Sequence, residues 1–215
     1  MLLLYALLFG AYSVAQSKGV DTLAGYIVRA NDTIRGRVIL PYKMVKREKE
    51  SRKQYEDEEW YQQVTLVDRS GGERMYIPAD ISAYGWDWND TLKATFRSFE
   101  VVVPRTGASL MKGKRKPFLK LEIEGPMSLY LYYHRENARE ADAFYSDRFL
   151  INEKRETQAL KIKVFLGTGF AYNLTGLESW FEGYPELSKF NLKSMVPLEV
   201  WLLVSGYNKW KKIVK

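Results

Sequence analysis

Residues 25–40, GYIVRANDTIRGRVIL, place the strongest constraint on the fold of this chain. Apolar and small residues alternate with polar ones on both sides of Asn31-Asp32, first Tyr26, Val28 and Ala30 and then Ile34, Gly36, Val38 and Leu40. A period of two is typical of strands that bury one face. The stretch therefore predicts a β-hairpin with its turn at Asn31-Asp32.

The same alternation recurs through the middle of the chain. Its clearest instance is residues 118–134, where two alternating runs flank a turn at Gly125-Pro126. One face of this hairpin is expected to be apolar and the other polar and aromatic. Further strands are expected at residues 64–67, 75–77, 84–88, 91–103 and 143–151. About nine short strands, in a chain with 14% aromatic residues, predict a mainly antiparallel β-sheet that forms a sandwich or a partly open barrel.

The hydrophobic period becomes helical after about residue 166. One set of apolar residues at helical spacing, preceded by a capping-box pair at Thr175 and Glu178, comprises Leu177, Trp180, Phe181 and Tyr184. A second helix, with Ser194 as N-cap and Pro197 in its first turn, has a stripe of Val196, Val200, Trp201, Val204 and Tyr207. We expect an α+β protein in which a C-terminal helical segment, residues 166–215, packs on a β-rich domain, residues 16–165.

Residues 1–15, MLLLYALLFGAYSVA, are uncharged and end in small residues. Ser13-Val14-Ala15 fits the small-x-small pattern of a signal peptide cleaved before Gln16. A buried N-terminal helix is the alternative, because the usual basic residues at the start are missing. The run is too short to anchor the chain across a bilayer. It predicts an exported protein, periplasmic or associated with the outer membrane but not integral to a membrane after cleavage.

The residue types needed for most catalysis are scarce. The chain has no cysteine and a single histidine, His134, so thiolate zinc sites and disulfides are excluded. No Ser/His/Asp set, metal-ligand spacing or phosphate loop is present. Glu122 and Glu124, two apart on one strand, leave a hydrolase as a third hypothesis with His134. We expect a protein that is not an enzyme, with no catalytic residues, no metal and no cofactor.

The net charge of +7 favours an anionic partner. Much of the basic charge lies in a charged run within residues 42–63, expected to be a solvated loop or short helix, and in a loop at residues 104–117. No nucleic-acid recognition motif accompanies it, so nucleic acid is not an expected partner. The candidate contacts with an anionic envelope surface are Lys46, Arg47, Lys112, Lys114 and Arg115.

Two groups of aromatic residues alternate along predicted strands. Tyr84, Trp86 and Trp88 share one strand face, and Tyr130 shares another with Tyr132. An exposed face of this kind is a platform on which a sugar ring or an apolar partner stacks, while core packing is the alternative. The candidate ligand-binding residues are Trp86, Trp88, Tyr130 and Tyr132.

Four segments in order resemble a family of uncharacterised exported proteins common in Bacteroidota: GYIVRANDTIRGRVIL, YIPADISAYGW, FLKLEIEGPMSLYLYY and WFEGYPELSKF with SGYNKW. The chain departs from that family at Gly183 and Tyr184, where Asp-Cys is frequent. The resemblance implies export and supports the fold, and it brings no established activity. It also implies O-glycosylation at the Asp-Thr-aliphatic sites Thr22, Thr33 and Thr91, each of which is expected at a turn or terminus.

These observations predict an exported, non-catalytic binding or structural module of the cell envelope. Its expected partner is an envelope protein, an anionic surface or a glycan. The alternative is a glycan-binding module that uses the aromatic platform.

Overall fold

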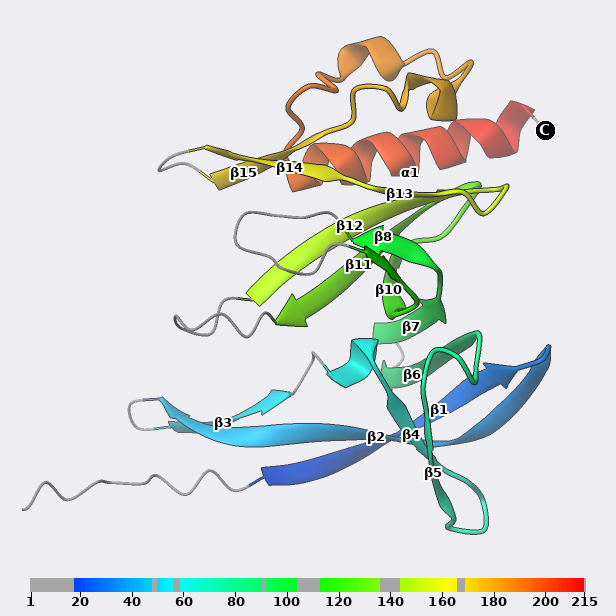
Figure 1. The fold of residues 1–215 in the computed structure, drawn as a ribbon, viewed down its shortest axis with the longest axis vertical. Helices are drawn as coiled ribbons and strands as arrows, with labels where there is room; N and C mark the ends of the chain where they lie inside the picture. The colour runs from blue at the N-terminus through cyan, green and yellow to red at the C-terminus, as the bar shows by residue number, and fades with distance from the viewer. Residues whose placement is uncertain are drawn as a thin grey trace, which may run out of the picture.

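The computed structural model describes residues 18–47, 50–55, 59–89, 92–103, 113–135, 144–165 and 169–214. These residues form mostly antiparallel β-sheet with one α-helix near the C-terminus, which confirms the predicted α+β class (Figure 1). The predicted signal peptide, Thr91 and Lys112 lie outside the described residues.

The main sheet has eleven strands, and every pairing in it is antiparallel. In order across the sheet they are β13 (Thr157–Ala159), β12 (Phe144–Asn152), β11 (Met127–Arg135), β10 (Phe118–Ile123), β7 (Leu92–Ser98), β6 (Ala83–Asn89), β1 (Lys18–Arg29), β2 (Asp32–Arg47), β4 (Val64–Val67) and β5 (Glu73–Tyr76), with β3 (Glu50–Tyr55) paired to β2. Two small sheets join β8 (Val101–Val103) to β9 (Gly113–Arg115) and β14 (Lys161–Phe165) to β15 (Gly169–Asn173). The described residues thus form fifteen strands rather than about nine, because several short pairs give no periodic signal.

The β1–β2 hairpin exists as predicted, with its turn one residue earlier. Ala30 and Asn31 form a two-residue loop, and both have positive φ, 47° and 70°. Primed turns of this kind match the twist of hairpin strands. Ile27 pairs with Ile34 and is buried, so the core-facing side of β1 is opposite to Tyr26.

In the described part of the charged run, residues 42–47 and 50–55 are strands rather than the predicted loop or helix, and a short 3₁₀ turn, η1 (Glu59–Tyr61), follows. β2 continues to Arg47 and pairs with β3, from Tyr42 opposite Tyr55 to Arg47 opposite Glu50. Figure 1 shows this pair as an arm that extends from the sheet. Backbone hydrogen bonds alone define the pairing of a ribbon, so a strand outside a core needs no apolar alternation. An apolar sequence pattern indicates burial and gives no signal for backbone pairing between strands.

Two hydrophobic cores lie on opposite faces of β11. Tyr130 and Tyr132 belong to the first core, with Phe96 of β7, while Met127 and Leu129 belong to the second. The expected polar, aromatic outer face of β11 is therefore wrong. A strand covered on both faces buries successive residues, whatever their polarity.

The first predicted C-terminal helix is wrong. Only two short 3₁₀ turns occur there, η2 (Glu178–Phe181) and η3 (Leu187–Lys189). Thr175 does not cap a helix, because its own N–H and hydroxyl bond the Asn173 side chain. Gly176 and Gly183 have φ of 91° and 77°, which end the helical backbone on both sides of η2.

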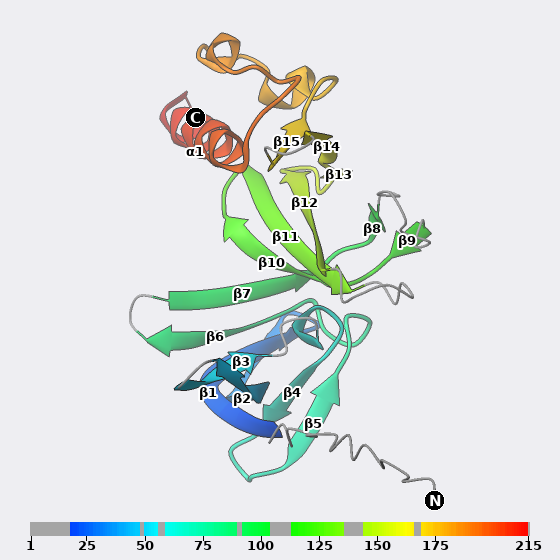
Figure 2. The ribbon, with the colours of Figure 1, turned by 90° about the vertical axis from the view of Figure 1, so that its left-hand side faces the viewer.

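The second predicted helix is confirmed as α1 (Pro197–Val214), which covers β11 and β15 in the second core (Figure 2). Its buried stripe differs from the prediction and comprises Val200, Leu203, Val204, Tyr207 and Asn208. Val196 and Trp201 are about half exposed. Among the described residues, no helix is both long and apolar enough to cross a membrane.

Candidate functional site

The pocket we single out lies at a break in the pairing of β2. This strand pairs with β4 as far as Ile39 and with β3 from Tyr42 onwards. At Leu40 and Pro41 the described strands pair β2 only with β1. Pro41 has no backbone N–H to donate, which favours an interruption of the ladder here. β4 and the 3₁₀ turn η1 (Glu59–Tyr61) diverge from β2 beyond this point.

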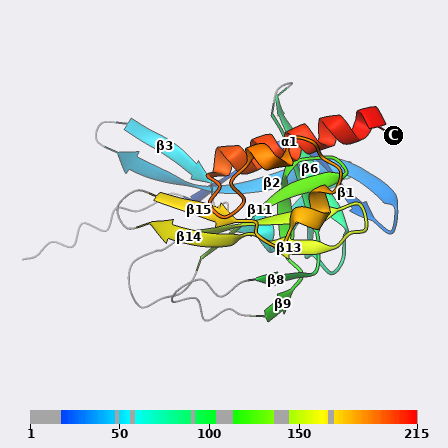
Figure 3. The ribbon, with the colours of Figure 1, turned by 90° about the horizontal axis from the view of Figure 1, so that it is seen from above.

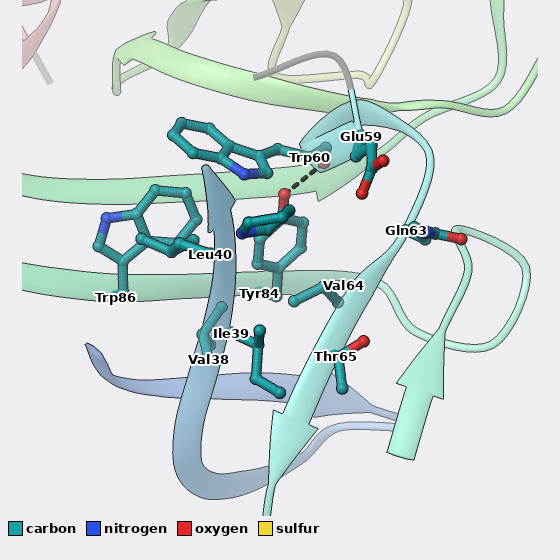
Figure 4. Close-up of a pocket in the computed structure, with 11 residues that line it drawn as sticks. Val38, Ile39, Leu40, Glu59, Trp60, Gln63, Val64, Thr65, Tyr84 and Trp86 are labelled. Carbon is teal, nitrogen blue, oxygen red and sulfur yellow. Dashed lines mark hydrogen bonds between the residues drawn. The ribbon is translucent and has the colours of Figure 1, made fainter. Parts of the chain in front are cut away.

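The break opens into a cavity of about 170 Å³. Figure 4 shows aromatic side chains at its back and polar side chains on the η1–β4 side. The lining residues are Val38, Ile39, Leu40, Pro41, Glu59, Trp60, Gln63, Val64, Thr65, Tyr84 and Trp86. The pocket thus combines ring faces with three hydrogen-bonding side chains, those of Glu59, Gln63 and Thr65.

The aromatic walls are held by mutual packing. The rings of Trp60 and Trp86 meet edge to face, with centroids 5.1 Å apart at 78°. Behind them Phe96 stacks on Trp86 at 5.2 Å and on Tyr84 at 4.7 Å. Trp86 is only 3% exposed, and Trp60 is partly buried at the edge of the first core. Interlocked rings of this kind stay in place when a ligand enters.

A hydrogen bond ties η1 to the sheet. The Tyr84 hydroxyl donates to the backbone carbonyl of Trp60, as drawn in Figure 4. Burial raises the pKa of Tyr84 well above its usual value, and Tyr61 adds to the effect. The hydrogen bond fixes the backbone that carries Trp60.

The predicted aromatic platform does not exist as an exposed surface. Tyr130 and Tyr132 are buried in the first core, because β11 is covered on both faces. Trp88 lies on β6, and its side chain is outside the described residues. Of the three candidates whose side chains the structure describes, Trp86 alone lines the pocket. Trp60, which the sequence analysis missed, faces it from a position directly after the charged run.

The described backbone places the predicted anionic contact residues on separate strands, and Lys112 lies outside the described residues. Lys46 and Arg47 end β2, and their side chains are outside the described residues. Lys114 and Arg115 are exposed on β9, where Lys114 lies 3.4 Å from Glu100. Figures 2 and 3 show the β2–β3 arm and β9 on different sides of the molecule.

Two of the predicted O-glycosylation sites can be located. Thr33 is exposed beside the hairpin turn, where the prediction places it. Thr22 lies in the middle of β1, opposite Ile39, and its hydroxyl accepts a hydrogen bond from Arg37. The expectation that each site is at a turn or terminus is therefore wrong for Thr22.

The carboxylates of the hydrolase hypothesis are each bound to an arginine. The Arg148 guanidinium donates two hydrogen bonds to the Glu122 carboxylate, at 2.8 and 3.0 Å, and one to the Tyr172 hydroxyl at 2.8 Å. Burial alone would lower the pKa of Arg148, but the hydrogen bonds and charge of Glu122 outweigh it and raise that pKa. Glu124 forms an ion pair with Arg97.

His134 lies on β11 opposite Tyr145, and its side chain is outside the described residues. The part of the chain that the structure describes has no group of three or more metal-ligating side chains. Comparisons with protein-family models, with curated proteins and with solved structures find no match to this chain. The pocket beside Leu40 and Pro41 is therefore the feature from which we infer a function.

Proposed function

We propose that this chain is a non-catalytic binding module of the cell envelope, and that the pocket beside Leu40 and Pro41 binds one ring of a glycan. The observation that carries the proposal is the pairing of the Trp60 and Trp86 walls with Glu59, Gln63 and Thr65. A sugar ring presents C–H groups to an aromatic face and hydroxyls to polar groups at its edge. Binding pockets commonly combine apolar and aromatic walls with a few placed polar groups.

The size of the pocket limits the ligand. Pockets for drug-sized ligands hold about 300–1,000 Å³, and this one holds about 170 Å³. It suits a single ring, such as the terminal or a projecting residue of a longer glycan. The remaining sugars would lie outside the pocket.

The lining chemistry supports binding without turnover. Glycoside hydrolysis commonly uses two carboxyl groups that flank the scissile bond. Among the residues that line this pocket, Glu59 carries the single carboxylate, and Glu122 is bound to Arg148 elsewhere. Export is supported by the composition of residues 1–15 and by the resemblance to exported proteins of Bacteroidota.

The test is a titration of the purified chain with a panel of envelope and extracellular oligosaccharides, followed by calorimetry. Trp60→Ala is expected to weaken binding at least about tenfold, or ~1.4 kcal/mol, because it removes one ring wall. Gln63→Ala is expected to weaken binding about fivefold, since one hydrogen bond contributes about 1 kcal/mol. Phe170→Ala, at an exposed ring on β15, serves as the matched control.

Binding that Trp60→Ala leaves unchanged would refute the assignment of the pocket. Consumption of any oligosaccharide during the titration, detected by chromatography, would refute the non-catalytic assignment.

A further inference from the structure

The outer side of α1 exposes large apolar side chains although the helix packs on the second core. Leu198 is 65% exposed, Trp201 47% and Leu202 49%. They follow one another at i, i+3 and i+4, so they form one patch at the start of the helix. Figure 2 shows α1 at the edge of the molecule, with the strands on one side of it only.

The same side of the helix carries lysines further towards its C-terminal end. Leu198, Leu202, Ser205, Lys209 and Lys212 follow one another by four or three residues, which aligns them along one line. Lys209 and Lys212 are exposed. Along about 21 Å of helix, this outer face begins with apolar side chains and continues with lysines, and the exposed Ile213 follows Lys209 by four residues.

Carboxylates that would neutralise this face are scarce on the helix. The single acidic residue of α1 is Glu199, and its carboxylate accepts the backbone N–H of Val196 at 2.8 Å. Lys211 belongs to another side, with its ammonium 5.9 Å from the ring centre of Tyr207 and 5.6 Å from that of Trp210. The positive charge of Lys209 and Lys212 is therefore presented outward.

We propose that the outer face of α1 docks on an anionic lipid bilayer. Leu198 and Leu202 enter the boundary between headgroups and acyl chains, and Trp201 takes the interfacial depth that tryptophan favours. Lys209 and Lys212 contact lipid phosphates, with their apolar stems along the surface. The helix lies in the interface and does not cross the bilayer. This inference is independent of the glycan pocket.

A second copy of the chain fits this face less well. Antiparallel pairing of two α1 helices would place Lys209 and Lys212 of one copy beside the apolar patch of the other. Parallel pairing would place lysines against lysines. Neither arrangement supplies a carboxylate, whereas an anionic bilayer offers an apolar interior and negative headgroups at one surface.

The experiment is cosedimentation of the purified chain with vesicles of phosphatidylcholine alone and of phosphatidylcholine mixed with phosphatidylglycerol. We expect binding to the anionic vesicles that weakens as salt is added. Trp201→Ser is expected to lower the partition coefficient about tenfold, and Lys209→Gln and Lys212→Gln about fivefold each, near the contribution of one basic residue. Met75→Ser, at an equally exposed apolar residue of β5, is the control and leaves binding unchanged.

Three results would overturn the proposal: no binding to anionic vesicles, equal binding to neutral vesicles, or equal losses with Met75→Ser. Sedimentation velocity without lipid provides the further test. A dimer abolished by Trp201→Ser would assign the face to a second copy instead. Thermal unfolding of each variant separates loss of docking from loss of fold, since the substituted side chains are exposed.

Discussion

The two hydrophobic cores on either side of β11 share a sheet and differ in how they are closed. The first core is built of interlocked aromatic rings and remains open at the break in β2 pairing beside Pro41. The second core is covered by α1 and is closed at one end by a polar side chain, Asn208. The pocket lies where the pairing of the described strands is interrupted, and the second core is closed where the backbone at a strand end finds partners.

Asn208 provides those partners. Its side-chain oxygen accepts the Met127 N–H at 2.8 Å, and its amide nitrogen donates to the Met127 carbonyl at 2.7 Å. Both backbone groups of the first residue of β11 are thereby satisfied inside the protein. A Cβ at Gly125 would lie 2.4 Å from the Asn208 nitrogen, so glycine is needed for this close approach.

The largest expected effect comes from removing the ring that supports the pocket walls. Phe96→Ala is expected to lower the free energy of unfolding by about 3–5 kcal/mol, because Phe96 is fully buried and stacks on Tyr84 and Trp86. Urea denaturation measures it. Phe170→Ala on β15, where the ring is 40% exposed, is the control and should cost far less. Equal losses of unfolding free energy in the two variants would mean that aromatic packing does not stabilise the first core.

The closure of the second core predicts the next largest effect. Asn208→Ala leaves the Met127 N–H and carbonyl without their partner, and we expect a loss of about 1–3 kcal/mol. The neighbouring exposed Lys209→Ala should stay within about 0.5 kcal/mol. Glycan binding by the first core should not change. An Asn208→Ala variant with an unchanged free energy of unfolding would contradict the role of Asn208 in closing the second core.

The ion pair between β10 and β12 predicts a smaller effect. Arg148→Met removes the ion-pair partner of Glu122. The Arg148 and Glu122 side chains are about one-fifth exposed, at 18% and 21%. Solvent screening reduces the cost of a fully buried pair, so we expect about 1–2 kcal/mol. The double variant with Glu122→Gln should recover part of the loss, which a double-mutant cycle detects. Additive losses would show that the pair is not coupled.

Alkaline pH is expected to destabilise both cores through their buried tyrosines. Burial raises the pKa of Tyr84 in the first core and of Tyr172 in the second. The unfolded chain releases these protons near the ordinary pKa of 10, whereas the folded chain retains them. The stabilising contribution is therefore complete below pH 10 and is lost as pH rises towards the folded pKa.

Each such tyrosine is expected to add a slope of up to about 1.4 kcal/mol per pH unit. Tyr84→Phe and Tyr172→Phe should each flatten the fall of unfolding free energy above pH 10, as measured by denaturation at a series of pH values. An unchanged slope in both variants would contradict the assignment to these residues.

Sequence periodicity predicted the elements that have a regular apolar pattern. The β1–β2 and β10–β11 hairpins and α1 all carry an apolar period that matches their geometry. The β2–β3 arm was missed because backbone pairing requires no apolar pattern. An outer face was expected for β11. Alternation of residue types distinguishes the two faces of a strand but does not reveal that both are covered.

The pocket was only partly predictable. Trp86 was selected for its alternation with Tyr84, although the structure places it in a wall and not on an exposed platform. Trp60 follows a run of charges, and its position depends on a 3₁₀ turn and on the break at Pro41, which are tertiary features. The aromatic pair Trp60-Tyr61 at the end of that run was the available signal.

The most direct test of the pocket is to record the indole N–H signals of the six tryptophans by nuclear magnetic resonance during titration with the glycan panel. Single Trp→Phe variants assign the signals. The account predicts that a bound glycan shifts the signals of Trp60 and Trp86 and leaves those of Trp201 and Trp210, at α1, unchanged. Shifts confined to α1, or no shift with any glycan of the panel, would contradict it.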